Sequence, residues 1–496
     1  MDSFSFEDIN EKIGRALFFT SGGKVFTFLL NFFFTPLLVR LISQKAYGNY
    51  AFLLSVVGLL NTIFLFGTKD AIRKFAAEES NQADSRRKFS LAALTITFLL
   101  TIGTFGGGIV FLYSGFSGLV FGSLPRIYIF LIFLIVALSI AFKNNLALLY
   151  GFHLQQVSEP IRVLQNFLFR VLAILLAFFG FGLVGVLSGW VVGVFLSLLM
   201  AFYYVVRHSS ITFRPSGLSG ILRKYIPPLI RFGRWAILAA LFSKILYQAD
   251  IMMIRYFLTP EDTAIYKAAL APVHFLWFIP RIIRNSLLPS LSELWKKGER
   301  KKLQLISKKG LKYVFLVTFL LAGGLFILNR EFVSVYYGMD YLQSAQLLRV
   351  LVLGAMAFSL ARITGPIFQA SNNVLTEAIV TGTAMVANIV LNFFFIQIYG
   401  LIGAAVATSL TYGLMLFLKV LGVSKVTDIT LFRGFPLKKV LALVVSWFAA
   451  LYIINELLPL GSLFSLIVIA GIGGFLFFLG IYLLGLIEKS ELEVLS

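Results

Sequence analysis

The chain has 496 residues, of which 59% are hydrophobic and 13% are charged, whereas about a quarter of the residues of an ordinary soluble domain are charged. This composition excludes a soluble enzyme and is typical of a helical protein that crosses a membrane many times. Lys and Arg number 43 against 22 Asp and Glu, so the formal net charge is +21. The chain has no cysteine, which excludes disulfides, thiolate metal sites and cysteine nucleophiles.

Long apolar segments in the first 206 residues predict six membrane-spanning helices. Strands of a membrane barrel are about ten residues long and alternate apolar with polar side chains, and these segments are longer and uniformly apolar. The run from Val171 to Val206 has no charge and is too long for one crossing, so we expect it to fold back at residues 179–182. The predicted spans are 16–41, 46–67, 90–114, 126–149, 161–181 and 183–206.

A basic segment at 207–230, which contains Pro227-Pro228, predicts a cytoplasmic linker between two halves of the chain. Eight further spans are predicted at 232–258, 263–288, 311–336, 341–369, 374–398, 400–420, 438–459 and 462–486. The fold class is therefore an all-α polytopic membrane protein with about fourteen transmembrane helices. The expected divisions are a six-helix lobe (1–206), the linker (207–230), a second six-helix lobe (231–420), and two additional helices with a short cytoplasmic tail (421–496).

Positive charge gathers in every second connection. Lys and Arg number six in 69–88, six in 207–234, eight in 296–312 and five in 419–439, whereas the other connections hold little besides Lys45 and Arg126. Short loops rich in Lys and Arg stay on the cytoplasmic side of a membrane. We therefore expect a multi-pass protein of the plasma (cytoplasmic) membrane with both termini in the cytoplasm. Because this charge sets the topology, we expect no nucleic-acid partner.

The two halves are weakly similar to each other. LLVRLISQKAYGNYAFLL, from Leu37, aligns with MMIRYFLTPEDTAIYKAAL, from Met252, so that Arg40 matches Arg255 and Tyr50 matches Tyr266. Two lobes related by a pseudo-two-fold axis along the membrane normal would place a cavity between them, as in transporters. The alternative is a chance alignment, because membrane sequences are low in complexity.

Three stretches resemble one family of membrane proteins. They are PLLVR at 36–40 followed by AYGNY at 46–50, VYYGMDYLQSAQLLRVL at 335–351, and QASNNVLTEAIVTGTAMVANIVLNFFFIQIYGLIGAAVATSLTYG at 369–413. Over nearly its whole length the chain resembles the polysaccharide-transporter (Wzx-type) flippases of the multidrug/oligosaccharidyl-lipid/polysaccharide exporter superfamily. The resemblance implies two six-helix lobes plus two helices, and the transfer of a polyprenyl-diphosphate-linked oligosaccharide from the cytoplasmic to the outer leaflet by alternating access. Lipid II flippases have a similar number of spans, so the glycan class stays open.

Polar residues form a stripe on the first predicted span. Thr20, Lys24, Thr27, Asn31 and Thr35 recur at steps of three and four, which places them on one face of a helix. An ionisable residue inside a membrane costs about 2.5–3.5 kcal/mol on insertion scales, so those present are candidates for function. We therefore expect Lys24 and Asn31 to contact the substrate, although a lysine at this depth can also extend to the headgroups.

The fifth and seventh spans carry further cations. Arg170 lies deepest in a series with Arg162 and Asn166 at steps of four. Lys244 lies near the centre of the seventh span and shares a face with Gln248 and Arg255, and Arg40 is the counterpart of Arg255 in the first half. The residues expected to bind the substrate are Arg40, Arg170, Lys244, Gln248 and Arg255. Asp250, on another side of the seventh helix, is either an ion-coupling site or half of a structural ion pair.

The eighth span combines basic and aromatic residues. Lys267, His274 and Arg281 are seven residues apart, with Trp277 and Arg284 alongside. Aromatic faces can stack on sugar rings, and guanidinium groups fit phosphate oxygens, so we expect His274, Arg281 and Arg284 to contribute to the cationic site. The alternatives are that the two arginines only follow the positive-inside rule and that His274 is a helix-packing residue.

Three functions remain to be compared. A flippase for an anionic lipid-linked glycan fits the intramembrane cations. A multidrug or cation exporter of the same superfamily needs acidic residues in its cavity, and these are few. A membrane-embedded glycosyltransferase or polymerase needs a sizeable external loop, and the outer connections are short. No ATP-binding motif is present, and we expect no enzyme activity, cofactor or metal. The expected partners are the lipid-linked oligosaccharide, the lipid bilayer, and glycan polymerase or glycosyltransferase machinery.

Overall fold

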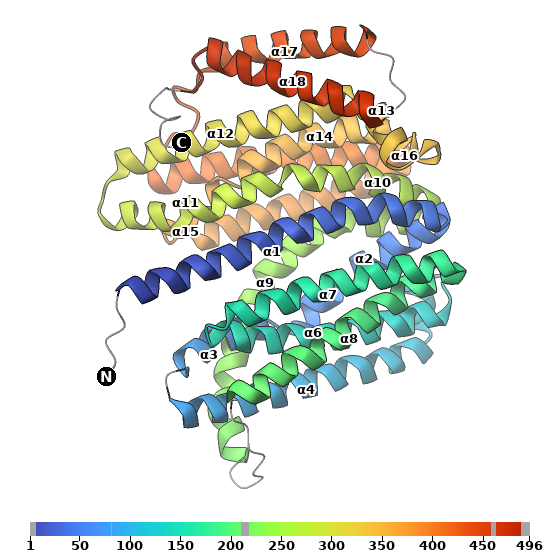
Figure 1. Ribbon diagram of the computed structural model, residues 1–496, viewed down its shortest axis with the longest axis vertical. Coiled ribbons are helices and arrows are strands. Elements are labelled where there is room, and N and C mark those ends of the chain that lie inside the picture. Colours follow the sequence, from blue (N-terminus) through green and yellow to red (C-terminus); the bar gives the residue numbers. More distant parts are fainter. Residues whose placement is uncertain (1–5, 81, 210–217, 458–462, 488–496) are drawn as a thin grey trace. The chain divides into compact units, whose positions relative to one another are not determined.

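The computed structural model describes residues 6–80, 82–209, 218–457 and 463–487, and these ranges contain helices and no strand. In the first half (Figure 1) the helices are α1 (Phe6–Leu41), α2 (Gln44–Leu65), α3 (Thr68–Glu78), α4 (Ala83–Tyr113), α5 (Phe116–Phe121), α6 (Arg126–Gly151), α7 (Gln155–Leu176), η1 (Ala177–Phe181), α8 (Gly182–Ser209) and α9 (Leu218–Phe257). In the second half they are α10 (Pro260–Leu276), α11 (Phe278–Lys296), α12 (Arg300–Ile327), α13 (Asn329–Tyr336), η2 (Met339–Tyr341), α14 (Ser344–Ala361), α15 (Thr364–Ala370), α16 (Val374–Thr427), α17 (Leu437–Leu457) and α18 (Leu463–Leu483). The predicted all-α class is confirmed.

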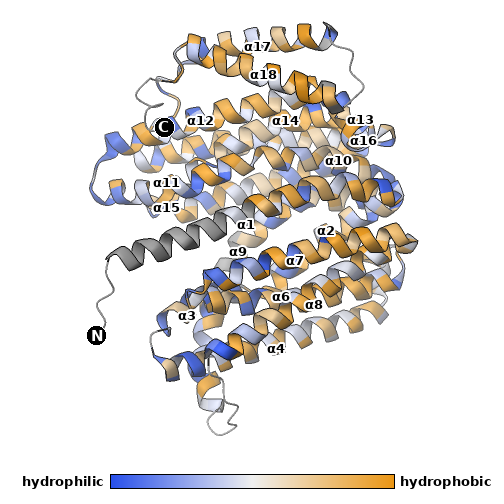
Figure 2. Cartoon of the chain, in the orientation of Figure 1, coloured by the Kyte–Doolittle hydropathy of each residue, from blue (hydrophilic) through white to orange (hydrophobic). Residues whose placement is uncertain are grey.

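The helices have the length and hydropathy of membrane spans. Within the described ranges nine helical segments are long and apolar enough to cross a membrane, and 25–41 of α1 is a shorter apolar stretch. Two of the nine, 155–209 and 374–427, each contain a fold-back. Figure 2 shows apolar residues along the helices and hydrophilic residues around α3 and at the turn between α11 and α12. The protein is therefore a multi-pass membrane protein, with about the predicted number of crossings.

Three predicted spans are each divided into two helices, although 344–370 still has the length and hydropathy of one span. The segment 263–288 is divided at Trp277 into α10 and α11, 311–336 at Leu328 into α12 and α13, and 341–369 at 362–363 into α14 and α15. Prolines explain two of the breaks: Pro280 and Pro366 have no N–H to donate to the carbonyls of Leu276 and Arg362, four residues before them. At the third break the Asn329 side chain donates to the Phe326 carbonyl at 2.6 Å and so caps the end of α12.

Two hairpins turn on glycines in an unusual backbone conformation. Gly182 has φ 52° and ψ −136°, and Gly400 has φ 58° and ψ −136°, a region that glycine adopts readily and other residues do not. The first turn lies where the sequence predicted a fold-back at 179–182, and α7 packs along α8 (Figure 1). This prediction is confirmed.

The hairpins also reveal a second internal repeat. Gly182-Leu183-Val184-Gly185 corresponds to Gly400-Leu401-Ile402-Gly403, and Glu159 and Glu377 precede the two turns by the same number of residues. Neither second glycine has room for a side chain: a Cβ would lie 2.8 Å from the Phe181 Cβ at Gly185 and 2.0 Å from the Phe395 carbonyl oxygen at Gly403. The same turn is therefore built twice from the same residues.

The chain divides into two compact units, unit 1 (Met1–Ile245) and unit 2 (Leu246–Ser496), and the boundary falls inside α9. In unit 1, α6 packs against α2, α3, α4, α7 and α8. In unit 2, α14 packs against α10, α12, α13, α15 and α16. Each unit is thus organised around one largely buried central helix.

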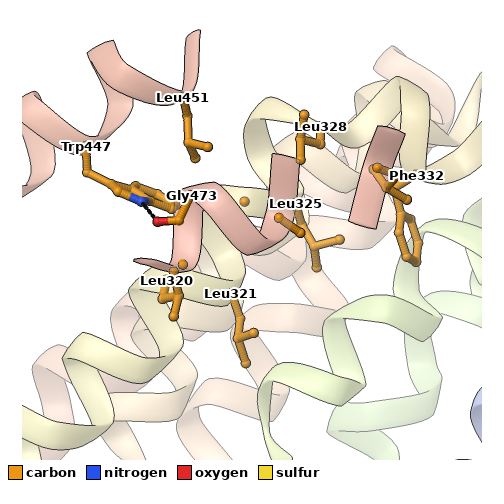
Figure 3. A pocket seen from close by; sticks show the side chains of 12 residues that line it. Leu320, Leu321, Leu325, Leu328, Phe332, Trp447, Leu451 and Gly473 are labelled. Atoms are coloured by element: carbon orange, nitrogen blue, oxygen red, sulfur yellow. Dashed lines mark hydrogen bonds between the residues drawn. The ribbon is translucent and has the colours of Figure 1, made fainter. Parts of the chain in front are cut away.

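The last two helices enclose an apolar cavity against α12 and α13. The cavity has a volume of about 290 Å³, and leucines, Phe332, Trp447 and small residues line it (Figure 3). The indole Nε1–H of Trp447 donates to the Gly473 carbonyl oxygen at 2.7 Å. With that donor satisfied, this cavity carries no group suited to bind a charged substrate.

Candidate functional site

Arg170 of α7 is a buried cation in unit 1, 9% exposed. Its guanidinium donates to Asn31 Oδ1 on α1, and its Nη1 donates to Asn166 Oδ1 at 3.1 Å and to the Asn166 carbonyl oxygen at 2.7 Å. The rings of Phe34 and Phe169 lie 5.7 Å and 5.5 Å from the guanidinium carbon. Its partners in the described part of the chain are amides and aromatic rings, so no carboxylate there neutralises its charge.

The polar stripe of α1 is largely satisfied within its own helix. Thr27 donates to the Gly23 carbonyl oxygen at 2.7 Å, Asn31 to that of Thr27 at 2.9 Å, and Thr35 to that of Asn31 at 3.2 Å. Asn31 uses its remaining amide oxygen to accept from Arg170. The side chains of Thr20 and Lys24 lie outside the described residues. Of the predicted stripe, Asn31 is thus the residue that links α1 to a buried charge.

Two lysines of unit 1 lie near each other without a described counter-ion. Lys143 of α6 and Lys244 of α9 are both partly buried. The charged groups that act on Lys143 are Lys244 and Lys69 of α3, and both are positive. Neither Lys143 nor Lys244 makes a hydrogen bond or salt bridge within residues 6–80, 82–209, 218–457 and 463–487. Like charges brought together in a partly buried place favour the binding of an anion.

Asp250 of α9 is the buried acid of unit 2, 3% exposed. Its Oδ2 accepts from the Tyr266 hydroxyl at 2.8 Å and its Oδ1 from the Ile251 backbone N–H at 2.8 Å. The Tyr266 hydroxyl oxygen is also 3.3 Å from Thr408 Oγ1 in the second arm of α16. Asp250 is therefore held by neutral donors, and Lys267 acts on it through its charge.

Aromatic rings form a cluster beside a further cation of unit 2. The Trp277 ring lies 4.6 Å from Phe358, 5.9 Å from Tyr412 and 4.7 Å from His274, measured between ring centroids. The guanidinium carbon of Arg362 lies 5.5 Å from the Trp277 ring and 4.8 Å from the Phe358 ring. This geometry stabilises the cation through the ring faces and leaves its nitrogen donors for other partners.

More positive charge surrounds Arg362. Arg281 and Arg284 of α11 act on it electrostatically, and Arg284 also acts on Lys419 of α16. Lys419 is 5% exposed, and its Nζ lies 3.4 Å from Glu377 Oε1. We call Arg281, Arg284, Arg362 and Lys419, together with Glu377, the cationic cluster of unit 2. Four positive side chains share one carboxylate there, so the cluster suits an anionic ligand.

The profile of the polysaccharide biosynthesis protein family matches residues 13–295, more than half of the chain. The chain belongs to this family. An uncharacterized membrane protein of Methanocaldococcus jannaschii is 26% identical over 299 residues, 58% of this chain and 57% of its own length. A Shigella flexneri protein named as a candidate O-antigen transporter is 23% identical over 390 residues, 75% of this chain and 88% of its own length. A Haloferax volcanii protein named as a candidate flippase of low-salt glycan biosynthesis is 21% identical over 184 residues, 37% of this chain and 39% of its own. The matches thus span less than two thirds of the methanogen and Haloferax proteins.

Solved structures show the same fold. A lipid II flippase in an inward closed conformation superposes with a TM-score of 0.72 at 17% identity, covering 93% of this chain and 97% of that chain. An inward-facing multidrug resistance transporter of the MATE family and MOP superfamily has a TM-score of 0.61 at 15% identity, covering 81% and 95%. At these identities the similarity establishes the architecture of this family member.

The remaining predicted residues are more dispersed. Arg40 is exposed in the last turn of α1, and Arg255 is partly buried in the last turn of α9, where Glu261 acts on it. Gln248 is partly buried on α9, and His274 lies against Trp277. The structure therefore brings His274, Arg281 and Arg284 into one neighbourhood of unit 2, and Asn31 and Arg170 into one neighbourhood of unit 1.

Sequence reasoning missed the role of three cations. Lys419 was counted as a loop charge in 419–439, but it lies inside α16 and is buried against Glu377. Arg362 and Lys143 lie within predicted spans, and the sequence alone makes each consistent with a polar residue that hydrogen-bonds a neighbouring helix. No spacing in the sequence pairs Lys419 with Glu377, which is 42 residues earlier in the chain. Within the described residues no group of three or more His, Asp or Glu side chains could hold a metal ion.

Proposed function

We propose that this protein is a flippase that carries a polyprenyl-diphosphate-linked oligosaccharide from the cytoplasmic to the outer leaflet by alternating access. Membership of the polysaccharide biosynthesis family, the names of the Shigella and Haloferax relatives, and the fold of a lipid II flippase support this function. The protein acts as a transporter in this proposal and not as an enzyme.

The observation that carries the proposal is the sign of the buried charge. Arg170, Lys143 and Lys244 in unit 1 have no described carboxylate partner, and the cationic cluster of unit 2 has one. Each intramembrane charge costs about 2.5–3.5 kcal/mol on insertion scales. An anionic substrate offsets this cost, whereas a cationic drug would add to it.

We assign substrate contacts to the basic and polar residues of each unit. They are Lys24, Asn31, Arg40, Arg170 and Lys244 in unit 1, and Gln248, Arg255, His274, Arg281 and Arg284 in unit 2. The lysine and arginine groups bind the diphosphate, since guanidinium forks match phosphate oxygens, and the amides hydrogen-bond the sugars.

Asp250 is the proposed coupling group. Its hydrogen bonds come from the neutral Tyr266 hydroxyl and a backbone N–H, an environment in which a carboxylate can exchange a proton or take up a cation. Because the sequence has no ATP-binding motif, the proposed energy source is an ion gradient, the membrane potential or removal of the product, and Asp250 would serve the first of these. The proposed setting is the cytoplasmic membrane, with both termini in the cytoplasm according to the loop charges, and with glycan polymerase or glycosyltransferase machinery as partners.

A transport assay tests the function directly. The full-length protein is reconstituted in liposomes with a fluorescent nitrobenzoxadiazole-labelled polyprenyl-diphosphate N-acetylglucosamine, and dithionite added outside reduces the probe in the outer leaflet. We expect the protected fraction of probe to fall with wild-type protein and to stay near one half with Lys244→Ala. Lys45→Ala, which removes the same charge from an exposed position of α2, is the matched control and retains transport.

The same vesicles separate the alternatives. A cationic dye such as ethidium should not be transported, because the proposed substrate contacts are mostly positive side chains. Dye transport without loss of the protected lipid probe would overturn the flippase proposal in favour of a multidrug exporter.

A further inference from the structure

Two buried donors in unit 2 have no acceptor. The indole Nε1–H of Trp277 and the Nε–H of Arg362 are buried and make no hydrogen bond within the described part of the chain. The Arg362 guanidinium lies 5.5 Å from the Trp277 ring, so both donors belong to one place. A buried unsatisfied donor costs about 1–3 kcal/mol. This cost is removed when a ligand brings an acceptor to the two donors.

The charge of this place selects the kind of acceptor. The cationic cluster has four positive groups and one carboxylate, an excess of three positive charges. Such an excess fits a ligand with more than one negative charge. Guanidinium groups bind phosphate oxygens in pairs, and the rings of Trp277 and Phe358 lie beside the Arg362 guanidinium.

Glu377 lies among the cations. Its Oε1 is 3.4 Å from Lys419 Nζ. A Cβ built on Gly365 would lie 2.9 Å from Glu377 Oε1 and 3.2 Å from Arg284 Nε, so this carboxylate and Arg284 approach the same point. The side chain of Glu377 is 18% exposed and that of Lys419 is 6% exposed. Glu377 is therefore the partner with more freedom to move away.

Resting on the proposed function, we propose that Arg284, Arg362, Lys419 and the Trp277 indole bind a phosphate group of the substrate, and that Glu377 is a resident carboxylate which this phosphate displaces. In the empty state Glu377 limits the cost of four neighbouring cations in a medium of low dielectric constant. When the phosphate leaves, Glu377 returns to Lys419. The carboxylate thus lowers the affinity for the phosphate and permits release.

Binding of inorganic pyrophosphate to the full-length protein in detergent micelles tests the exchange. Arg362→Gln should weaken binding by roughly tenfold or more, since hydrogen bonds to charged groups are worth that much. Glu377→Gln should strengthen binding by roughly three- to tenfold, because the competing charge is gone while the shape is kept. Isothermal titration calorimetry gives both changes, and the melting temperature without ligand shows that each variant is folded.

Glu159→Gln is the matched control. It makes the same chemical change at the corresponding position of unit 1, where Glu159 is paired with Arg162, and it should leave pyrophosphate binding unchanged. If Glu377→Gln weakens binding, Glu377 supports the site and is not displaced, and the inference is wrong. The inference is also wrong if Glu377→Gln and Glu159→Gln have the same affinity for pyrophosphate, or if Arg362→Gln binds pyrophosphate as tightly as the wild-type protein does. Arg362→Lys, which keeps the charge, should bind pyrophosphate more tightly than Arg362→Gln and less tightly than the wild-type protein. It replaces Arg362→Gln as the test variant if Arg362→Gln is unfolded.

The liposome assay distinguishes this failure from failure of the function. Suppose that the wild-type protein and the variants bind pyrophosphate with the expected ranking of affinities, but that the wild-type protein moves no lipid probe. This result contradicts the flippase proposal and supports the anion site. Normal probe transport by Arg362→Gln and Glu377→Gln contradicts the inference and leaves the flippase proposal standing. If the inference holds, Glu377→Gln slows turnover at saturating probe, because release becomes limiting.

Discussion

The two units build the same hairpin and differ in how the buried charges near it are partnered. In unit 1 the first arm, α7, carries Arg170, whose charge is held by Asn31, Asn166 and aromatic rings. In unit 2 the corresponding arm of α16 begins with Glu377, which is paired with Lys419 of the second arm. Asp250 of α9 accepts from Tyr266, whose hydroxyl oxygen lies 3.3 Å from Thr408 of the second arm. The comparison shows that the same glycine turn is compatible with different partners for the buried charges.

The largest predicted effect tests whether the two turns are equally strict. Gly403→Ala should lower the free energy of unfolding by about 3 kcal/mol, because overpacking against a fixed backbone atom is costly and a Cβ there would lie 2.0 Å from the Phe395 carbonyl oxygen. Gly185→Ala should cost less, because the nearest atom to a new Cβ there, the Phe181 Cβ, is 2.8 Å away and needs a smaller displacement. Thermal unfolding of the purified protein measures both. Gly413→Ala, where no atom lies within 4 Å of a new Cβ, is the control, and equal melting of Gly403→Ala and Gly413→Ala would refute the prediction.

Arg170→Ala tests the charge of unit 1. We expect a loss of about 1–3 kcal/mol, because the substitution leaves Asn31 and Asn166 without a donor. Arg170→Lys should restore little, since the three donors of an ammonium group sit on one nitrogen, whereas Arg170 reaches Asn166 and Asn31 from two separate nitrogens of its planar guanidinium. Denaturation of the micelle-bound protein gives the values. Arg126→Ala removes an exposed charge at the start of α6 and should have no comparable effect; a similar loss there would mean that Arg170 acts only through net charge.

Tyr266→Phe tests the acid of unit 2. The variant removes the hydroxyl that donates to Asp250 at 2.8 Å, and we expect it to cost about 1 kcal/mol. Tyr50→Phe, at the position that aligns with Tyr266 in the sequence, should cost less, because the Tyr50 hydroxyl makes no hydrogen bond within the described residues. Parallel melting curves of the two variants decide the matter. A larger loss for Tyr50→Phe would reverse the contrast drawn between the units.

The smallest predicted effect concerns the ion pair between Lys297 and Glu293, which is exposed, whereas the pair between Lys419 and Glu377 is largely buried. The Lys297 ammonium hydrogen-bonds Glu293 and holds the pKa of that carboxyl below its ordinary value. A carboxyl group whose pKa is lower in the folded than in the unfolded protein stabilises the fold at pH values above its unfolded-state pKa. This stabilisation is lost as the pH falls through its folded-state pKa. Because both groups are exposed, Glu293→Gln should melt like wild type at pH 7 and at pH 4. A clear difference at pH 7 that vanishes on acidification would show that the exposed pair matters.

Hydropathy predicted the helices well, because uncharged runs of spanning length leave few other structures open in a membrane. The breaks at Trp277 and at 362–363 were missed, although Pro280 and Pro366 mark them in the sequence, because a proline in an apolar run is also compatible with a kinked single span. The partners of the charges could not be predicted. Arg170 meets Asn31, and Lys419 meets Glu377, through helix packing that sequence spacing does not encode.

The glycine turns also bear on how the chain is made. Residues 155–209 and 374–427 each pass from one arm to the other through a turn without a hydrophilic loop. One arm is not expected to insert into the membrane before the other, because the turn between them has no polar loop that could remain in water. Each pair of arms must enter the bilayer together during synthesis, with its two flanks on the same side. A ribosome pausing after Gly182 or Gly400 would therefore hold half of a hairpin in the insertion machinery.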